Sequence, residues 1–437
     1  MTKRHGYALL AALAAVVVLI SGAIFVGAGG GGEEAASAGR SKHGGPAAPA
    51  ASGSWVGSWS TAPAAAEPHS ERGYPNTSIR NIVHTSIGGS GIRVRLSNLY
   101  GTAPLTISHA SVALAEAPST PVAAHGTMRR LTFSGAATVV IPAGEQVVSD
   151  TARLPVPAAA DLLVSTYSPS PAGPVTYHPF ARQSSYLAAG DRTEETTGAF
   201  YTQQSPYWRY LTGVEVWSTE AAGSVVILGD SITDGITSTF GANQRWTDFL
   251  ATRLRTEAGA PRYGVLNQGI SGNRILVDGS LLAPTNGPSA QRRFGRDVLS
   301  HSGVRAVVVQ LGVNDILKTP HQTDPEKIID GMRALVRQAH AHGLRVVGGT
   351  LMPFGGHRAY APHLDAVREQ VNAEIRAGRV FDAVVDFDLA LRDPAHPYRL
   401  LPRYDSGDHL HPSDEGFRAM AHALDLRHLK GSVPARL

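Results

Sequence analysis

The period of the hydrophobic pattern changes near residue 223. Between residues 54 and 222, apolar and polar residues alternate in short runs such as Ile92-Arg93-Val94-Arg95-Leu96, with Gly and Pro clusters between the runs. Similar runs lie at 105–108, 138–141 and 162–167, and no long helical pattern interrupts them. A period of two predicts β-strands with one buried face. We therefore expect residues 54–222 to form an all-β, sandwich-like accessory domain.

From residue 223 to residue 437, apolar strands alternate with amphipathic helices. The predicted strands lie at 225–228, 265–266, 306–311, 345–350 and 384–385. Trp246, Phe249, Leu250 and Leu254 mark the helix after the first strand, and a last helix is expected from about Ser413. Such alternation predicts an α/β domain with a doubly wound, flavodoxin-like parallel sheet covered on both faces. Ligands of such sheets bind outside the carboxyl ends of the strands.

The N-terminus resembles an export signal. Lys3, Arg4 and His5 precede an uncharged stretch at 7–26 that is long enough to span a bilayer. Residues 1–26 are thus expected to be a signal peptide or a signal anchor, with the basic end inside. Residues 27–53 read as a linker rich in Gly, Ala and Pro. The protein is expected to be secreted, or held on the outer face of the cytoplasmic membrane by a single anchor.

Composition excludes several classes of function. The chain has 437 residues, a formal net charge of +4 and no Cys. Disulfides, Cys-ligated zinc and a cysteine nucleophile are therefore excluded. The charge is mild for this length and no basic stripe interleaved with aromatics occurs, so a nucleic-acid partner is not expected.

Polar clusters follow the predicted parallel strands. They are Gly229-Asp230-Ser231, Ser271-Gly272-Asn273, Gly312-Val313-Asn314-Asp315 and Asp408-His409-Leu410-His411-Pro412. A parallel sheet would bring them to one edge, where they supply the groups that acyl transfer to serine requires. Taken alone, Ser231 could be only a helix N-cap and Asn314 could simply close a turn.

The four clusters, in this order, resemble the blocks of the SGNH (GDSL) hydrolase superfamily. The similarity extends over roughly 224–430, and Ile232 replaces the leucine of the "GDSL" name. The resemblance implies that Ser231 is the nucleophile, His411 the base and Asp408 the residue that orients the base. It also implies that the enzyme needs no metal or organic cofactor.

The same resemblance implies an oxyanion hole. Its donors would be the backbone N–H of Ser231, the backbone N–H of Gly272 and the side-chain amide of Asn314. Gly269 is the competing glycine in the second block, and Gly272 is preferred because it follows Ser271 in "NQGISGN".

These residues predict an exported serine esterase that acts on carboxylic esters through an acyl-enzyme. With its β-rich front part, the chain looks most like the arylesterase/acylhydrolase-type members of the superfamily, so short acyl groups on polysaccharides or aryl esters are the first expectation. A lipase or phospholipase is the runner-up. A non-catalytic carbohydrate-binding surface protein and an acyltransferase are further alternatives. The sequence contains neither G-x-S-x-G nor H-E-x-x-H, which disfavours the ordinary α/β-hydrolase fold and a zinc peptidase.

Other polar and aromatic residues receive less specific interpretations. Tyr207, Trp208, Tyr210 and Trp217 could stack on sugar rings, but packing at the interdomain boundary is favoured. Asp230 and Asp315 are expected to bond to backbone and shape their loops, and His409 to be structural or solvent-facing. Solvated positions without a metal-ligand pattern are expected for His340, His342, His357 and His363.

Overall fold

A computed structural model describes residues 53–431, which belong to one compact unit. The predicted export segment at 1–26 and almost all of the predicted linker lie outside the described residues. Within 53–431, no helix is both long and apolar enough to cross a membrane.

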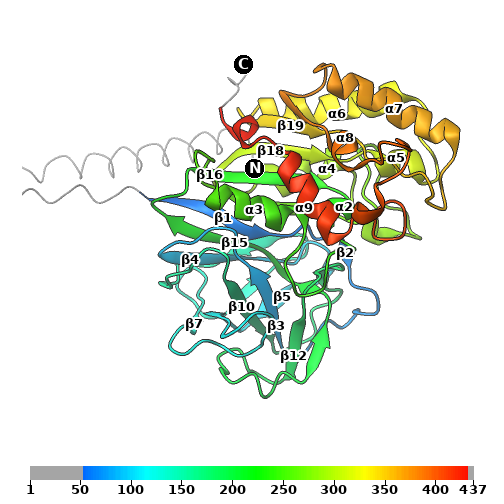
Figure 1. The fold of residues 1–437 in the computed structure, drawn as a ribbon. Coiled ribbons are helices and arrows are strands. Elements are labelled where there is room, and N and C mark those ends of the chain that lie inside the picture. Colours follow the sequence, from blue (N-terminus) through cyan, green and yellow to red (C-terminus); the bar gives the residue numbers. More distant parts are fainter. Residues whose placement is uncertain (1–52, 432–437) are drawn as a thin grey trace, which may run out of the picture. The chain divides into compact units, whose positions relative to one another are not determined.

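The first part of the described chain is built from antiparallel strands (Figure 1). Its two larger sheets have the strand orders β1-β15-β4-β9 and β13-β12-β3-β10-β6-β7. The strands are β1 (Ser54–Ser60), β2 (Ala65–Ala66), β3 (Thr77–His84), β4 (Gly91–Ser97), β5 (Leu105–Ile107), β6 (His109–Leu114), β7 (Arg129–Arg130), β8 (Val139–Ile141), β9 (Gln146–Val148), β10 (Asp161–Ser168), β11 (Thr176–His178), β12 (Ser185–Ala189), β13 (Gln203–Ser205), β14 (Trp208–Arg209) and β15 (Leu211–Ser218). The strand runs predicted from alternation coincide with β4, β5, β8 and β10.

A core shared by the two larger sheets explains the period of two in this part. Val94 and Val214 from the four-stranded sheet and Val112 and Val164 from the six-stranded sheet belong to one buried cluster. Alternate residues of each strand point to one face, so the apolar set is buried between the sheets. The prediction of a sandwich-like β-rich part is confirmed.

The second part contains a five-stranded sheet of the order β17-β16-β18-β19-β20, in which every pairing is parallel. Its strands are β16 (Gly223–Gly229), β17 (Tyr263–Gly269), β18 (Val304–Gln310), β19 (Arg345–Gly349) and β20 (Ala383–Val385). In order of appearance this is 2-1-3-4-5, the doubly wound order of flavodoxin. Every residue of β16 is buried, as expected for a strand covered on both faces. The predicted fold class is confirmed.

Helices connect the parallel strands. They are α2 (Ser231–Asp234), α3 (Trp246–Thr256), α4 (Ala290–Phe294), α5 (Val313–Leu317), α6 (Pro325–His340), α7 (Pro362–Arg376), α8 (Phe387–Leu391) and α9 (Asp414–Ala423). Short 3-10 turns are η1 (Pro284–Asn286), η3 (Pro402–Tyr404) and η4 (Leu426–Leu429), and η2 (Gly295–Leu299) is a π-turn that continues α4. Contacts join α3, α8 and α9 in one group and α4, α6 and α7 in another (Figure 1).

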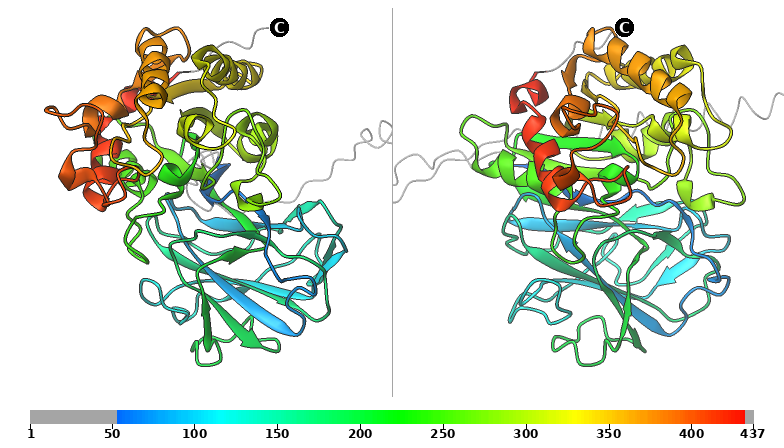
Figure 2. Two further views of the ribbon diagram at one scale, coloured as in Figure 1. Left: turned by 90° about the vertical axis from the view of Figure 1, so that its right-hand side faces the viewer. Right: turned by 45° about the vertical axis from the view of Figure 1, so that its right-hand side comes forward.

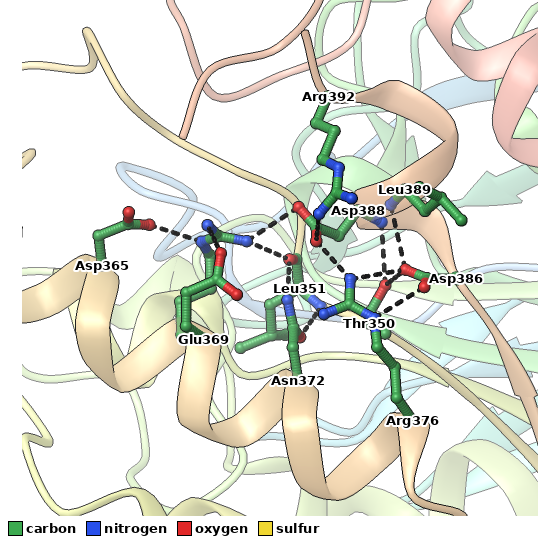
Figure 3. A network of polar contacts seen from close by, with 11 residues as sticks. Thr350, Leu351, Asp365, Glu369, Asn372, Arg376, Asp386, Asp388, Leu389 and Arg392 are labelled. Atoms are coloured by element: carbon green, nitrogen blue, oxygen red, sulfur yellow. Dashed lines mark hydrogen bonds and ion pairs between the residues drawn. The ribbon is translucent and has the colours of Figure 1, made fainter. Parts of the chain in front are cut away.

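A network of ion pairs fixes α7 against the sheet and α8 (Figure 3). The buried guanidinium of Arg368 donates to Asp388 Oδ1 at 2.9 Å and to Asp365 Oδ1 at 2.7 Å. Asn372 of the same helix binds the backbone of Leu351, accepting from its N–H at 2.7 Å and donating to its carbonyl at 2.9 Å. The network thereby holds the chain at the carboxyl end of β19.

The two parts meet where β1 crosses the edge strand β17 (Figure 2). A Cβ placed on Gly264 would lie 2.0 Å from the carbonyl oxygen of Gly57, so only glycine permits this backbone approach. The outward N–H of Val265 donates to Ser86 Oγ at 2.9 Å, and Gly57 N–H donates to Ser224 Oγ at 3.0 Å. The β-rich part therefore covers this edge of the parallel sheet and accepts the hydrogen bond of the Val265 N–H.

Candidate active site

The turn after β16 presents Ser231. Asp230 caps α2 by accepting a hydrogen bond from Ile232 N–H at 3.0 Å, and Ser231 is the first helical residue. A Cβ on Gly229 would lie 2.1 Å from Thr233 Oγ1, so the tight turn needs a glycine there. Since Asp230 is the N-cap, the alternative in which Ser231 is present only as a cap does not describe this turn.

Ser231, His411 and Asp408 form one chain of hydrogen bonds. Ser231 Oγ lies 2.8 Å from His411 Nε2, and His411 Nδ1 lies 2.6 Å from Asp408 Oδ2. Asp408 Oδ1 also accepts from the backbone N–H groups of Leu410 at 3.0 Å and His411 at 2.8 Å. The carboxylate thus holds both the backbone and the ring of the histidine in place. The structure brings together all three residues that the sequence singled out.

The charge of Asp408 is stabilised by its partners. Burial opposes ionisation, but the hydrogen bonds from the His411 side chain and backbone outweigh it and hold the pKa of Asp408 well below its usual range. A carboxylate at this position fixes the proton of His411 on Nδ1, which leaves Nε2 free to accept the proton of Ser231 Oγ.

Backbone donors lie beside this chain of hydrogen bonds. Among the described residues, neither the N–H of Ser231 nor that of Gly272 donates to a protein acceptor. The side-chain amide of Asn314 donates to Asp230 Oδ2 at 3.3 Å, which leaves its second hydrogen for another acceptor. Ser231, Gly272 and Asn314 all line one cleft, so the three expected oxyanion donors share one space.

The competition between Gly269 and Gly272 has a structural answer. The N–H of Gly269 is used by Asn267 Oδ1 at 2.9 Å, and Gly269 is the last residue of β17. Gly272 has φ +80°, and a Cβ there would lie 2.2 Å from Asn286 Oδ1. Gly272 is therefore the glycine with a free donor, and both its backbone angle and its crowded surroundings require glycine.

Two buried carboxyls shape the loops around the site, as the sequence indicated. Asp315 accepts from the N–H of Ile275 at 2.8 Å and of Leu276 at 3.0 Å, and Asp230 caps α2. Burial raises the pKa of Asp230 to about 7 and that of Asp315 to about 6. Backbone donors oppose both shifts, but desolvation dominates.

The cleft is open and has a volume of about 890 Å³; it is lined by polar side chains and by the apolar residues Phe180, Ile236, Leu317, Ala359 and Leu410. Several lining residues were not singled out from the sequence: Phe180, Thr285, Asn286, Lys318 and Arg358. Phe180 comes from the β-rich part, and no local pattern distinguishes it from other loop residues. Lys318 closely follows the third motif block and lies beside Gly272, since a Cβ on Gly272 would be 2.7 Å from its Nζ. Burial, with a contribution from Arg274, lowers the pKa of Lys318.

The remaining histidine predictions have mixed outcomes. His409 is half-exposed and its Nδ1 lies 2.6 Å from Asp405 Oδ2, in agreement with a structural or solvent-facing position. His342 and His363 are exposed, and His340 pairs with Asp382 at 3.0 Å. His357 is half-buried on a loop that lines the open cleft, and burial lowers its pKa.

The aromatic residues at 207–217 mostly pack inward. Trp208 and Tyr210 are buried, and Trp208 stacks edge-on against Trp59 at 4.9 Å between ring centroids. Trp208 also lies 5.6 Å from His178, which contacts the α/β part. The favoured interpretation, packing at the boundary, is confirmed for Trp208. Trp217 remains partly exposed and packs edge-on against Trp55.

The doubly wound sheet, with serine, histidine and aspartate at its carboxyl edge, defines a hydrolase with a flavodoxin-like α/β fold. Residues 227–419 match the family described as GDSL-like lipase/acylhydrolase. The chain therefore contains a domain of this family, and it is a carboxylic ester hydrolase.

Comparison with solved structures finds similar chains of low identity. A putative lipolytic protein of the G-D-S-L family from Desulfitobacterium hafniense is 20% identical over 46% of this chain and 96% of its own, with a TM-score of 0.36. Est24, a carbohydrate acetylesterase from Sinorhizobium meliloti, is 20% identical over 46% and 95%, with a TM-score of 0.36. The aryl esterase of M. smegmatis is 17% identical over 46% and 95%, with a TM-score of 0.36. No curated protein sequence matches the chain.

Proposed function

We propose that this protein is an exported serine esterase that removes short acyl groups from polar alcohols, such as polysaccharides, or from aryl esters. The observation that carries the proposal is the series of hydrogen bonds from Ser231 Oγ to His411 Nε2 at 2.8 Å and from His411 Nδ1 to Asp408 Oδ2 at 2.6 Å. These hydrogen bonds end at a cleft that is also lined by the three expected oxyanion donors, Ser231, Gly272 and Asn314.

In the acylation half-reaction, His411 Nε2 takes the proton of Ser231 while Oγ bonds to the ester carbonyl carbon. The carbonyl π electrons move to oxygen, and the N–H groups of Ser231 and Gly272 and the amide of Asn314 stabilise that negative charge. Each such donor typically lowers the activation barrier by about 3 kcal/mol. The carbon–oxygen bond to the alcohol then breaks, and His411 returns its proton to the departing oxygen.

Deacylation repeats these steps with water. His411 Nε2 takes a proton from water as the hydroxyl oxygen bonds to the acyl carbon, and the same donors stabilise the second oxyanion. When the bond to Ser231 Oγ breaks, the proton goes to that oxygen and the carboxylic acid leaves. Asp408 remains ionised throughout and stabilises the imidazolium that forms twice per turnover.

The polar side chains beside the oxyanion donors support a polar alcohol as the leaving group. Asn286, Asn314 and Lys318 lie near the donors. Apolar residues also line the cleft: Phe180, Ile236, Leu317, Ala359 and Leu410. A long acyl chain needs a continuous apolar wall, because each methylene contributes only when it leaves water. The polar side chains beside the donors favour an esterase that acts on polar alcohols, and the chain-length series below tests the lipase or phospholipase alternative.

The test is hydrolysis of p-nitrophenyl esters of increasing chain length and of acetylated xylan, with Ser231→Ala in parallel. We expect the highest kcat/KM on the shortest chains and a fall of at least a thousandfold in kcat for Ser231→Ala. A preference for long chains would replace the proposal with the lipase alternative. A folded wild-type protein that cleaves no ester would favour the carbohydrate-binding alternative, and acyl transfer to an added sugar would reveal a transferase.

Export is proposed from the sequence of the N-terminus, where three basic or titratable residues precede the apolar stretch at 7–26. Cell fractionation of the full chain, followed by N-terminal sequencing, tests it. We expect the protein outside the cytoplasm, and the sequencing distinguishes a cleaved signal peptide from a retained anchor. Activity confined to the cytoplasm would contradict the proposal.

A further inference from the structure

A short segment of the β-rich part, His178-Pro179-Phe180-Ala181-Arg182, contacts the α/β part beside the candidate active site. We call it the 178–182 segment; it begins with the last residue of β11. Arg182 Nε donates to the carbonyl of Ser238 at 2.9 Å, and Phe180 lines the cleft. The carbonyl of Ala181 accepts a hydrogen bond from Arg245, whose Nε also donates to the carbonyl of Asp234 at 3.2 Å.

The most buried of these contacts joins His178 to Asp234. His178 Nε2 lies 2.9 Å from Asp234 Oδ1, and the two side chains are only 2% and 3% exposed. His178 Nδ1 lies 2.8 Å from the carbonyl oxygen of Ala62. Since that carbonyl can only accept, Nδ1 carries a hydrogen, and a second hydrogen lies between Nε2 and Asp234 Oδ1.

Asp234 also binds the loop that contains Ser271 and Gly272, which we call the oxyanion loop. Its Oδ2 accepts from the backbone N–H of Ser271 at 3.0 Å and from Ser271 Oγ at 2.6 Å. Ser271 precedes Gly272, whose N–H is one of the expected oxyanion donors. Asp234 itself is the last residue of α2, the helix that begins with Ser231. One buried carboxylate therefore ties together the nucleophile helix, the oxyanion loop and the β-rich part.

We propose that His178 is a positioning residue for ester hydrolysis, acting through Asp234 and Ser271 to hold the N–H of Gly272 at the oxyanion position. The inference rests on the proposed esterase function. The β-rich part would then contribute a residue that the active site needs for its geometry. A buried carboxylate is stable only when it is paired, so without His178 the side chain of Asp234 must turn toward water and release Ser271. Displacement of an oxyanion donor destabilises the transition state more than it destabilises the bound ester, so it lowers kcat more than it changes KM.

Two substitutions of His178 distinguish a role in positioning Asp234 from a general contribution to the stability of the fold. In His178→Gln, the longer amide places an N–H where Nε2 donates to Asp234; in His178→Asn, the amide reaches only toward Ala62. We expect kcat to fall tenfold to a hundredfold in His178→Asn with KM changed less than threefold, and to fall less than tenfold in His178→Gln. A merely structural role would not favour the variant that keeps the Asp234 contact.

The control is His109→Asn. His109 Nδ1 pairs with Asp191 Oδ2 at 2.7 Å within the β-rich part. This variant makes the same substitution in a His–Asp pair that lies outside the candidate active site, and we expect its kcat and KM to match the wild type.

Ser271→Ala keeps the proposal testable if His178→Asn does not fold. It removes only the hydroxyl bond to Asp234, and we expect kcat to fall severalfold to tenfold at nearly constant KM. In the double variant with His178→Gln, the losses should be less than multiplicative, because both act through Asp234.

The outcomes separate this inference from the proposed function. A wild-type protein without Ser231-dependent ester hydrolysis would overturn the proposed function itself. If the wild type is active and the folded His178 variants keep the wild-type kcat, only the positioning role is overturned. If the His178 variants do not fold, a wild-type kcat in Ser271→Ala overturns it instead. Equal losses in His178→Gln and His178→Asn would also overturn it.

Discussion

At the scale of single residues, the site combines groups that the motif blocks contain with constraints that only the fold reveals. Ser231, His411 and Asp408 could be named from their order along the chain because parallel strands bring their carboxyl ends to one edge. The partner of Asp230 could not be named in this way, since Asn314 reaches it from α5, at 3.3 Å. Burial, which raises the pKa of Asp230, is likewise a property of the folded molecule.

Gly272→Ala should damage catalysis more than stability. The backbone at φ +80° strains an alanine by about 1 kcal/mol, and its Cβ would press on Asn286 Oδ1. Relief of that contact moves the N–H of Gly272, so we expect kcat on a short p-nitrophenyl ester to fall about a hundredfold. Gly378→Ala is the matched control, with φ +70° and nothing within 4 Å of the new Cβ. A similar loss of kcat in both variants would contradict this account.

Asp230 should make the protein less stable as the pH rises from about 4 to about 7. Its pKa is raised to about 7, whereas an unfolded aspartate titrates near 4. In this window the unfolded chain binds fewer protons than the folded one, so the free energy of unfolding falls with pH, by on the order of 4 kcal/mol for this group alone.

The measurement is urea unfolding of the wild type and Asp230→Asn at several pH values between 4 and 7. We expect the difference in unfolding free energy between the two proteins to shift in favour of the variant as the pH rises. A difference that is constant across the window would show that Asp230 ionises in the folded protein as it does in the unfolded chain.

At the scale of elements, periodicity predicts where the helices lie, but it does not predict which charged residues are buried on their inner faces. The spacing of Leu364, Val367, Val371 and Ile375 identifies the inner face of α7 correctly, and all four are buried. Arg368 is buried on the same helix, which a hydrophobic pattern cannot indicate, because its partner Asp388 comes from a different element (Figure 3). Similarly, no sequence periodicity marks the short α4 and its π-turn continuation η2.

Asp388→Ala should destabilise the fold by about 3 kcal/mol. The variant removes a fully buried carboxylate that pairs with Arg368 at 2.9 Å and also with Arg376 and Arg392. Loss of one partner leaves buried positive charge without compensation. Thermal and urea unfolding measure the effect.

Arg379→Ala is the control for that experiment. Arg379 lies just beyond the end of α7, and its ion pair with Glu374 is exposed to solvent, so no measurable change in the free energy of unfolding is expected. Equal effects of the two substitutions would mean that burial does not decide the strength of these ion pairs.

At the scale of the whole molecule, the change of period near residue 223 marks a change of architecture, from antiparallel strands ending at Ser218 to a parallel sheet starting at Gly223. The sequence does not indicate how closely the two parts depend on each other. The contacts of Gly57 with Gly264, of Ser86 with Val265 and of His178 with Asp234 join residues far apart in the chain. Local patterns carry no information about such pairings.

A fragment that begins at Gly223 should fail to fold stably, although it contains every motif block. Removing the β-rich part exposes the edge strand β17, leaves Val265 N–H without Ser86 and leaves Asp234 without His178. We expect insoluble expression, or a soluble fragment without cooperative unfolding, compared with a chain that starts at Ser54. A soluble fragment with a sharp unfolding transition and wild-type kcat would contradict this expectation.

The glycine-to-glycine crossing of β1 and β17 has a consequence for how such a chain can change by recombination. The carbonyl of Gly57 occupies the place that a side chain on Gly264 would need. The β-rich part and the α/β part therefore fit together through direct main-chain contact. A crossover in the short connection between Ser218 and Gly223 would join halves that had never been fitted together. The segment from Ser54 to the end of the parallel sheet should therefore be inherited as one block, with substitutions at the crossing appearing in pairs.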